Sequence, residues 1–96
     1  MTKQELVRAK RDDILRLAKL HGAKNVRLFG SIARGDAKEE SDVDVLIEAG
    51  PQTTAFFPGG LVADLEELLG CKVDIVTEAA LHPRIRKRVL EEAEPL

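Results

Sequence analysis

The chain has 96 residues, a hydrophobic fraction of 44%, a charged fraction of 33% and a formal net charge of −2. Its length suits one domain over residues 1–96, and its acidic balance and three aromatic residues count against direct nucleic-acid binding. The single cysteine excludes an internal disulfide, and without an apolar leader or spanning segment we expect a cytoplasmic protein that does not bind membranes.

The first half of the chain predicts two strands separated by a short helical segment. Apolar side chains recur at helical spacing over residues 3–21, and Gly22 follows as a stop. A strand over 25–31 comes next, with Val26 and Leu28 on one face and Arg27 and Phe29 on the other. One or two helical turns over 31–35 and a polar loop over 36–41 then lead to a second strand over 42–48.

The second half continues the alternation of helices and strands. Residues 51–60 form a loop whose middle has no clear pattern, a helix follows over 60–69, and Gly70 stops it. A third strand covers 71–77, and a final helix covers 82–96 with Pro83 in its first turn. This order predicts an α/β (α+β) domain in which helices pack on one face of a small mixed sheet.

Two carboxylates interrupt the apolar second strand. Side chains alternate along a strand, so Asp42 and Asp44 share one face while Val43, Val45 and Ile47 take the other and pack on helices. Burying carboxylates is costly unless a cation meets them, and without one the pair would repel until one held a proton. Two carboxylates on one face suit a hard divalent cation such as Mg²⁺.

Residues just upstream add a phosphate site. Gly30 and Ser31 end the first strand and open the short helix. Glycine lets the backbone approach a ligand closely, and the serine hydroxyl with the free N–H groups of a helix start can hold a phosphate. A phosphate cradle beside a metal clamp fits a nucleoside triphosphate bound with Mg²⁺.

Asp74 supplies a third carboxylate in the strand over 71–77. If this strand lies beside the strand over 42–48, Asp42, Asp44 and Asp74 form a triad suited to two-metal nucleotidyl transfer. Asp74 would then bind the second metal or accept the proton of the attacking hydroxyl. A lone D-x-D also occurs on solvated strand edges and in caps, and the glycine–serine pair together with Asp74 favours the catalytic interpretation.

The spacing of these residues resembles a known signature. Gly30-Ser31, ten intervening residues and Asp42-Val43-Asp44 are similar to the GS-x10-DxD motif of the DNA polymerase β-like nucleotidyltransferases. The string GSIARGDAKEESDVDVLIE resembles the minimal nucleotidyltransferase (MNT) domain, and the similarity extends over most of the chain from about Val26. The segment TTAFFPGG matches less well, and nothing is carried over to it.

The resemblance implies a polymerase β-like fold and a role in a toxin–antitoxin pair. Small MNT proteins neutralise a HEPN-domain ribonuclease toxin, in characterised cases by moving AMP from ATP onto a tyrosine hydroxyl of the toxin. By position, Gly30 and Ser31 would hold the triphosphate, Asp42 and Asp44 would bind Mg²⁺, and Asp74 would be the third acidic residue. We therefore expect ATP as substrate, Mg²⁺ in a two-metal site and a heteromeric complex with the toxin.

Arg34 and the basic run 84–88 leave alternatives open. Arg34 is a candidate nucleotide-binding residue, but an ion pair with Asp36 or a nearby glutamate is slightly favoured. The run 84–88 is expected to be mainly a solvated helix face, with docking to an acidic patch of the toxin as the alternative. His21 and His82 are expected to be helix-end residues rather than metal ligands.

Two other functions stay possible at the level of the sequence. A non-catalytic antitoxin would block its toxin by stoichiometric binding, although the intact Gly30, Ser31 and three aspartates count against a decayed site. A nucleotidyltransferase for a small molecule or an RNA end is the other alternative. The short chain and its acidic balance count against that one, because such enzymes usually carry further domains that hold the acceptor.

Overall fold

The computed structural model describes residues 1–53 and 56–96. Its helices are α1 (Lys3–Ala9), α2 (Arg11–Leu20), α3 (Ser31–Arg34), α4 (Gly59–Leu69), the 3₁₀ helix η1 (Glu78–Ala80) and α5 (Pro83–Glu92). Its strands are β1 (Ala23–Phe29), β2 (Val43–Ala49), β3 (Val73–Thr77) and β4 (Glu94–Pro95). Within those two ranges, no helix combines the length and the apolar character needed to cross a membrane.

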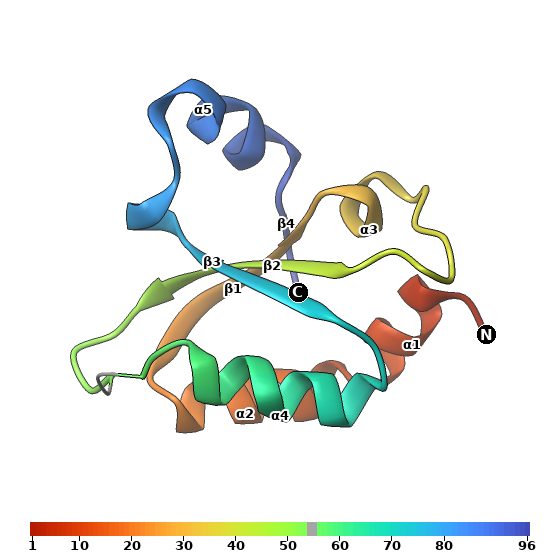
Figure 1. Cartoon of the computed structure of the whole chain (residues 1–96), viewed down its shortest axis with the longest axis horizontal. Coiled ribbons are helices and arrows are strands. Elements are labelled where there is room, and N and C mark those ends of the chain that lie inside the picture. Colours follow the sequence, from red (N-terminus) through yellow and green to blue (C-terminus); the bar gives the residue numbers. More distant parts are fainter. Residues whose placement is uncertain (54–55) are drawn as a thin grey trace.

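The strands form one mixed sheet in the order β3-β2-β1-β4 (Figure 1). β2 pairs in parallel with β3, and β1 pairs antiparallel with both β2 and β4. Helices α2 and α4 lie side by side beneath this sheet in Figure 1, and α5 lies above it. The small mixed sheet predicted from the alternating pattern is therefore confirmed.

The main core lies between the sheet and helices α1, α2 and α4. Val43, Val45 and Ile47 of β2 are buried in it, at 1%, 2% and 0% exposure, as the alternating pattern predicts. The helices contribute side chains from the stripes seen in the sequence, and the buried ones include Val7, Ile14, Ala18, Leu61, Leu65 and Leu69. Because these apolar side chains fill one face, the polar side chains of β2 are left on the other.

A second, smaller core holds α5 against that other face. Leu46 of β2 is fully buried and packs with Leu81 and Val89, with Phe29 and Val76 at the margin. Helices therefore lie on both faces of the sheet and not on one face as predicted, because α5 covers the face that also carries Asp44.

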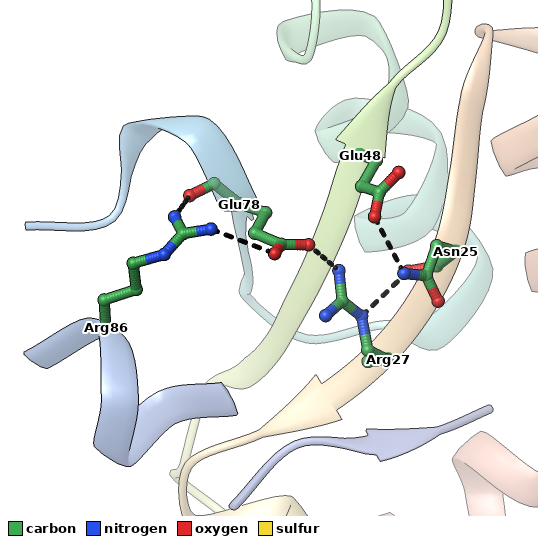
Figure 2. A network of polar contacts seen from close by, with 5 residues as sticks. All are labelled: Asn25, Arg27, Glu48, Glu78 and Arg86. Carbon is green, nitrogen blue, oxygen red and sulfur yellow. Dashed lines mark hydrogen bonds and ion pairs between the residues drawn. The ribbon is translucent and has the colours of Figure 1, made fainter. Parts of the chain in front are cut away.

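A polar network anchors the start of α5 (Figure 2). The Glu78 carboxylate accepts from Arg27 Nη2 at 2.9 Å and from Arg86 Nη2 at 3.1 Å, and the Glu78 carbonyl accepts from Arg86 Nη1 at 2.8 Å. The Arg27 side chain is only 12% exposed, so its charge is compensated by Glu78 rather than by water. Asn25, with a φ of 53°, donates to Glu48 at 3.0 Å in the same network.

The predicted helix over 3–21 is wrong in one respect, because the chain bends at Lys10 and gives two helices. No proline or glycine marks this point. At the far end of α1, Lys3 Nζ donates to the carbonyl oxygens of Glu39 and Ser41 at 2.6 and 2.5 Å. These contacts lie 36 and 38 residues away along the chain, so local periodicity cannot indicate them.

The final helix also ends earlier than predicted. It stops at Glu92, and Glu94–Pro95 form β4, which pairs with Arg27 and Leu28 of β1. The residue before a proline is restricted to extended conformations, and Pro95 has no N–H to donate, so the helix cannot continue through this segment. Pro83 does lie in the first turn of α5, as predicted.

The loop over 51–60 contains the part of the chain that the structure leaves out. Phe57 packs against the main core, whereas the Phe56 side chain is 85% exposed. Residues 54–55 of the segment TTAFFPGG lie outside the described residues.

Leu46→Ala should lower the free energy of unfolding by about 2–5 kcal/mol, because it leaves a cavity under α5. Urea denaturation would measure the loss. Leu20, whose side chain is 75% exposed, is the matched control, and Leu20→Ala should change the stability by less than about 0.5 kcal/mol. An equal, small loss in both variants would show that α5 does not pack on Leu46 in solution.

Candidate active site

Asp44 and Asp74 lie beside each other on neighbouring strands. The parallel pairing of β2 with β3 aligns Asp44 with Asp74, and paired residues of adjacent strands project from the same face. Asp42 directly precedes β2, two residues from Asp44. Asp42 and Asp74 are exposed, and Asp44 is partly buried. The adjacency on which the predicted triad depends is therefore present.

Gly30 lies against the Asp44 carboxylate. A Cβ at Gly30 would lie 2.2 Å from Asp44 Oδ2, which is closer than atoms can approach. The φ of Gly30 is 70°, a conformation that favours glycine for a second, independent reason. Ser31 follows as the first residue of α3, so the glycine brings the serine to the edge of the carboxylate site.

Burial and the neighbouring negative charges raise the pKa of Asp44 to about 6. Burial contributes most, followed by the negative charges of Asp74 and Asp42, while Arg34 acts in the opposite direction. Without a cation, Asp44 therefore keeps its proton into mildly acidic solution, as expected for carboxylates crowded on one face.

The carboxylates of the described residues do not form a preformed metal-binding site. Within residues 1–53 and 56–96, no group of three or more His, Cys, Asp or Glu side chains is arranged to hold a metal ion. The raised pKa of Asp44 comes mainly from burial, the negative charges of Asp74 and Asp42 add to it, and a divalent cation would offset those charges. The oxygen donors of Asp42, Asp44 and Asp74 suit Mg²⁺, so the chemistry of the site fits this ion.

Arg34 is engaged with two carboxylates. Its Nη1 is 2.7 Å from Glu92 Oε1, and its Nε is 3.3 Å from Asp36 Oδ2. The ion pairs considered as the alternative to nucleotide binding are thus present. Sequence reasoning gave Glu92 no role at the site, and the separation of 58 residues from Arg34 offers no signal for it.

The basic run 84–88 is mostly exposed, as expected, but Arg86 is used structurally in the network around Glu78. The two histidines are helix-end residues, also as expected. His21 caps the C-terminus of α2 and pairs with Asp64 at 2.7 Å, and His82 caps the N-terminus of α5.

A known protein family shares the sequence pattern of most of this chain. The family model described as a nucleotidyltransferase domain matches residues 9–96. The protein adenylyltransferase MntA of Thermococcus cleftensis is 44% identical over 73 residues, which cover 74% of this chain and 72% of that protein.

Solved structures share the fold. A structure described as a "putative minimal nucleotidyltransferase" superposes with a TM-score of 0.87 at 48% identity, covering 97% of this chain and 95% of that one. A toxin–antitoxin structure with AMP-PNP superposes with a TM-score of 0.74 over 88% of this chain and 69% of that one. The identity to the second is 21%, so that likeness shows the fold alone.

In metal-free protein, the Asp44 carboxyl should titrate near pH 6 in a ¹³C NMR experiment. Asp74→Asn should lower this pKa, because it removes a neighbouring negative charge. Asp12→Asn removes an exposed carboxylate of α2 and should leave the pKa unchanged. If Asp74→Asn also leaves it unchanged, the two carboxylates are not neighbours in solution.

The same pKa predicts how stability depends on pH. The folded-state pKa of Asp44, about 6, lies above its ordinary value of 3.8, so folding favours the protonated form. This contribution is complete below pH 3.8 and is lost as the pH rises through about 6. Asp44→Asn cannot ionise, so in urea without metal its stability relative to the wild type should increase from about pH 4 to about pH 6 and stay level above about pH 7. A constant difference across this range would contradict the prediction.

Proposed function

The chain belongs to the nucleotidyltransferase domain family, and on that basis we propose that it moves AMP from ATP onto a tyrosine hydroxyl of a HEPN-domain ribonuclease toxin and so acts as an antitoxin. One observation carries this proposal. Asp44 and Asp74 are neighbours on parallel strands, Gly30 lies directly against Asp44, and Ser31 follows Gly30 as the first residue of α3. The name of the Thermococcus relative, a protein adenylyltransferase, supports a protein acceptor.

Each residue of the site has a role in this proposal. Ser31 would donate its hydroxyl to the triphosphate, and Gly30 lets the turn before Ser31 lie directly against Asp44. Asp42, Asp44 and Asp74 would hold Mg²⁺. When bound, Mg²⁺ offsets the negative charge of the triphosphate and the carboxylates and stabilises the charge that develops at the transferred phosphoryl group.

The proposed reaction is a displacement at the α-phosphorus of ATP. The tyrosine oxygen forms a new bond to this phosphorus, the bond from the phosphorus to the bridging α–β oxygen breaks, and diphosphate leaves. The tyrosine proton passes to a carboxylate, for which Asp74 is suited because it is exposed at the edge of the site. A side chain exposed in this way can meet a hydroxyl presented by another protein, so we propose a heteromeric complex with the toxin.

The decisive experiment is intact-mass spectrometry of the co-expressed toxin after incubation with this protein, ATP and Mg²⁺. We expect the toxin to gain the mass of one or more AMP units. The Asp42→Asn/Asp44→Asn variant should abolish this gain, because it removes two of the three carboxylates. Peptide mapping of the modified toxin would then identify the acceptor residue.

Other outcomes of that experiment separate the alternatives. A silenced toxin with no mass gain, held in a stable complex by wild type and variant alike, would favour a non-catalytic antitoxin. Release of diphosphate without any modified protein would favour a small-molecule or RNA acceptor.

Mg²⁺ should raise the thermal unfolding midpoint of the wild-type protein, because it binds the folded carboxylate site in preference to the unfolded chain. Asp44→Asn should lose most of this shift. Asp12→Asn should keep it and controls for general screening of the acidic surface. The measurement is a thermal melt at pH 7.5 with and without MgCl₂, at equal ionic strength. A shift of equal size in all three proteins would argue against binding at Asp44.

A further inference from the structure

A cavity of about 490 Å³ lies between α5 and the turn at Gly30. Gly30 and Arg34 line one side of it, and Arg88 and Glu92 of α5 line the other. Arg88 and Glu92 are four residues apart on one helix, so they present neighbouring side chains to the cavity. Helix α5 therefore forms a wall of the space next to the candidate phosphate site.

Glu92 bridges that space with both of its carboxylate oxygens. Oε2 accepts a hydrogen bond from the Gly30 backbone N–H at 3.1 Å, and Oε1 accepts from Arg34 Nη1 at 2.7 Å. The bond with Arg34 lowers the pKa of Glu92, and the bond from Gly30 acts in the same direction. The Gly30 bond is partly buried, so water weakens it less than it would on an open surface, whereas the Arg34 side chain is 52% exposed and its bond to Glu92 is open to water.

The Gly30 bond matters because of what Gly30 touches. Gly30 has a left-handed φ of 70°, contacts the Asp44 carboxylate and directly precedes Ser31. The hydrogen bond to Glu92 fixes the direction of the Gly30 N–H and so restricts rotation of the peptide between Phe29 and Gly30. Glu92 thus holds the residue that lies against Asp44 and leads directly into Ser31.

The Arg34 bond matters because it orients a cation beside the same cavity. The bonds to Glu92 and Asp36 use only part of the donor set of a guanidinium, which leaves further N–H groups for a phosphate oxygen. Arg34 offsets part of the negative charge of Glu92, although that charge still contributes to the raised pKa of Asp44.

We propose that Glu92 is a positioning residue of the nucleotide site, which fixes the Gly30 turn and the Arg34 guanidinium so that they can receive the triphosphate of ATP. This inference rests on the proposed function. It assigns a role in nucleotide binding to the last turn of α5, which otherwise contributes only to packing.

The test compares three variants with the wild type by isothermal titration calorimetry, using a non-hydrolysable ATP analogue and MgCl₂. Glu92→Ala should weaken binding about tenfold, which is typical for the loss of a charge-assisted hydrogen bond. Glu92→Gln keeps the size of the side chain but presents an amide donor to one of the two N–H donors, so it should weaken binding too. Glu91→Ala, at the exposed neighbour on the same helix, should bind as the wild type does.

A second readout needs no nucleotide. The Gly30 amide proton should shift upfield in ¹H–¹⁵N spectra of Glu92→Ala and stay in place in Glu91→Ala, which a loss of packing alone would not produce. In an Arg34→Ala background, Glu92→Ala should cost less affinity than in the wild type, because part of its effect acts through Arg34.

The outcomes distinguish this inference from the proposed function. A wild-type chain that binds no nucleotide would overturn the proposed function and with it the site that Glu92 serves. Wild-type binding that both Glu92 variants retain would overturn the assignment of Glu92 alone. Tighter binding by these variants would also overturn it, because Glu92 would then compete with the phosphate.

Discussion

The confinement of one carboxylate, that of Asp44, organises the rest of the site. It is partly buried, it lies beside Asp74 on the adjacent strand, and it touches Gly30 where no side chain fits. A free carboxylate in such a place would relax toward water or toward a cation of the protein. Here the backbone of β2 holds Asp44 close to Asp42 and Asp74. The stability of the fold therefore keeps the carboxylates together despite their mutual repulsion.

Much of this arrangement could be predicted from local patterns. The alternation of apolar and acidic residues in β2 indicated correctly which side chains enter the main core and which remain on the opposite face. The adjacency of Asp44 and Asp74 depended on one assumption, that β2 and β3 are neighbours. Parallel neighbouring strands are usually connected through a helix, and the segment between β2 and β3 contains α4, so the assumption agrees with the order of the elements.

The features that could not be predicted all depend on distant partners. Glu92 meets Gly30 across 62 residues, and Arg27 meets Glu78 across 51. The bend at Lys10 has no breaker residue, and the helices on its two sides are held by tertiary contacts, such as those of Lys3 with Glu39 and of Val7 and Ile14 in the main core. A charged residue on a helix is usually solvated, so no reading of the sequence alone would choose Glu92 over Glu91.

Strand β3 lies at one edge of the sheet, within the part of the chain that the structure describes. The edge of a sheet offers unpaired backbone groups to any other strand, which makes it a route to aggregation, and charged side chains oppose such pairing. Asp74 is the second residue of this strand and lies beside Asp44. The same carboxylate that the proposed chemistry needs therefore also protects the open edge from joining a second sheet, and replacing it would remove both effects together.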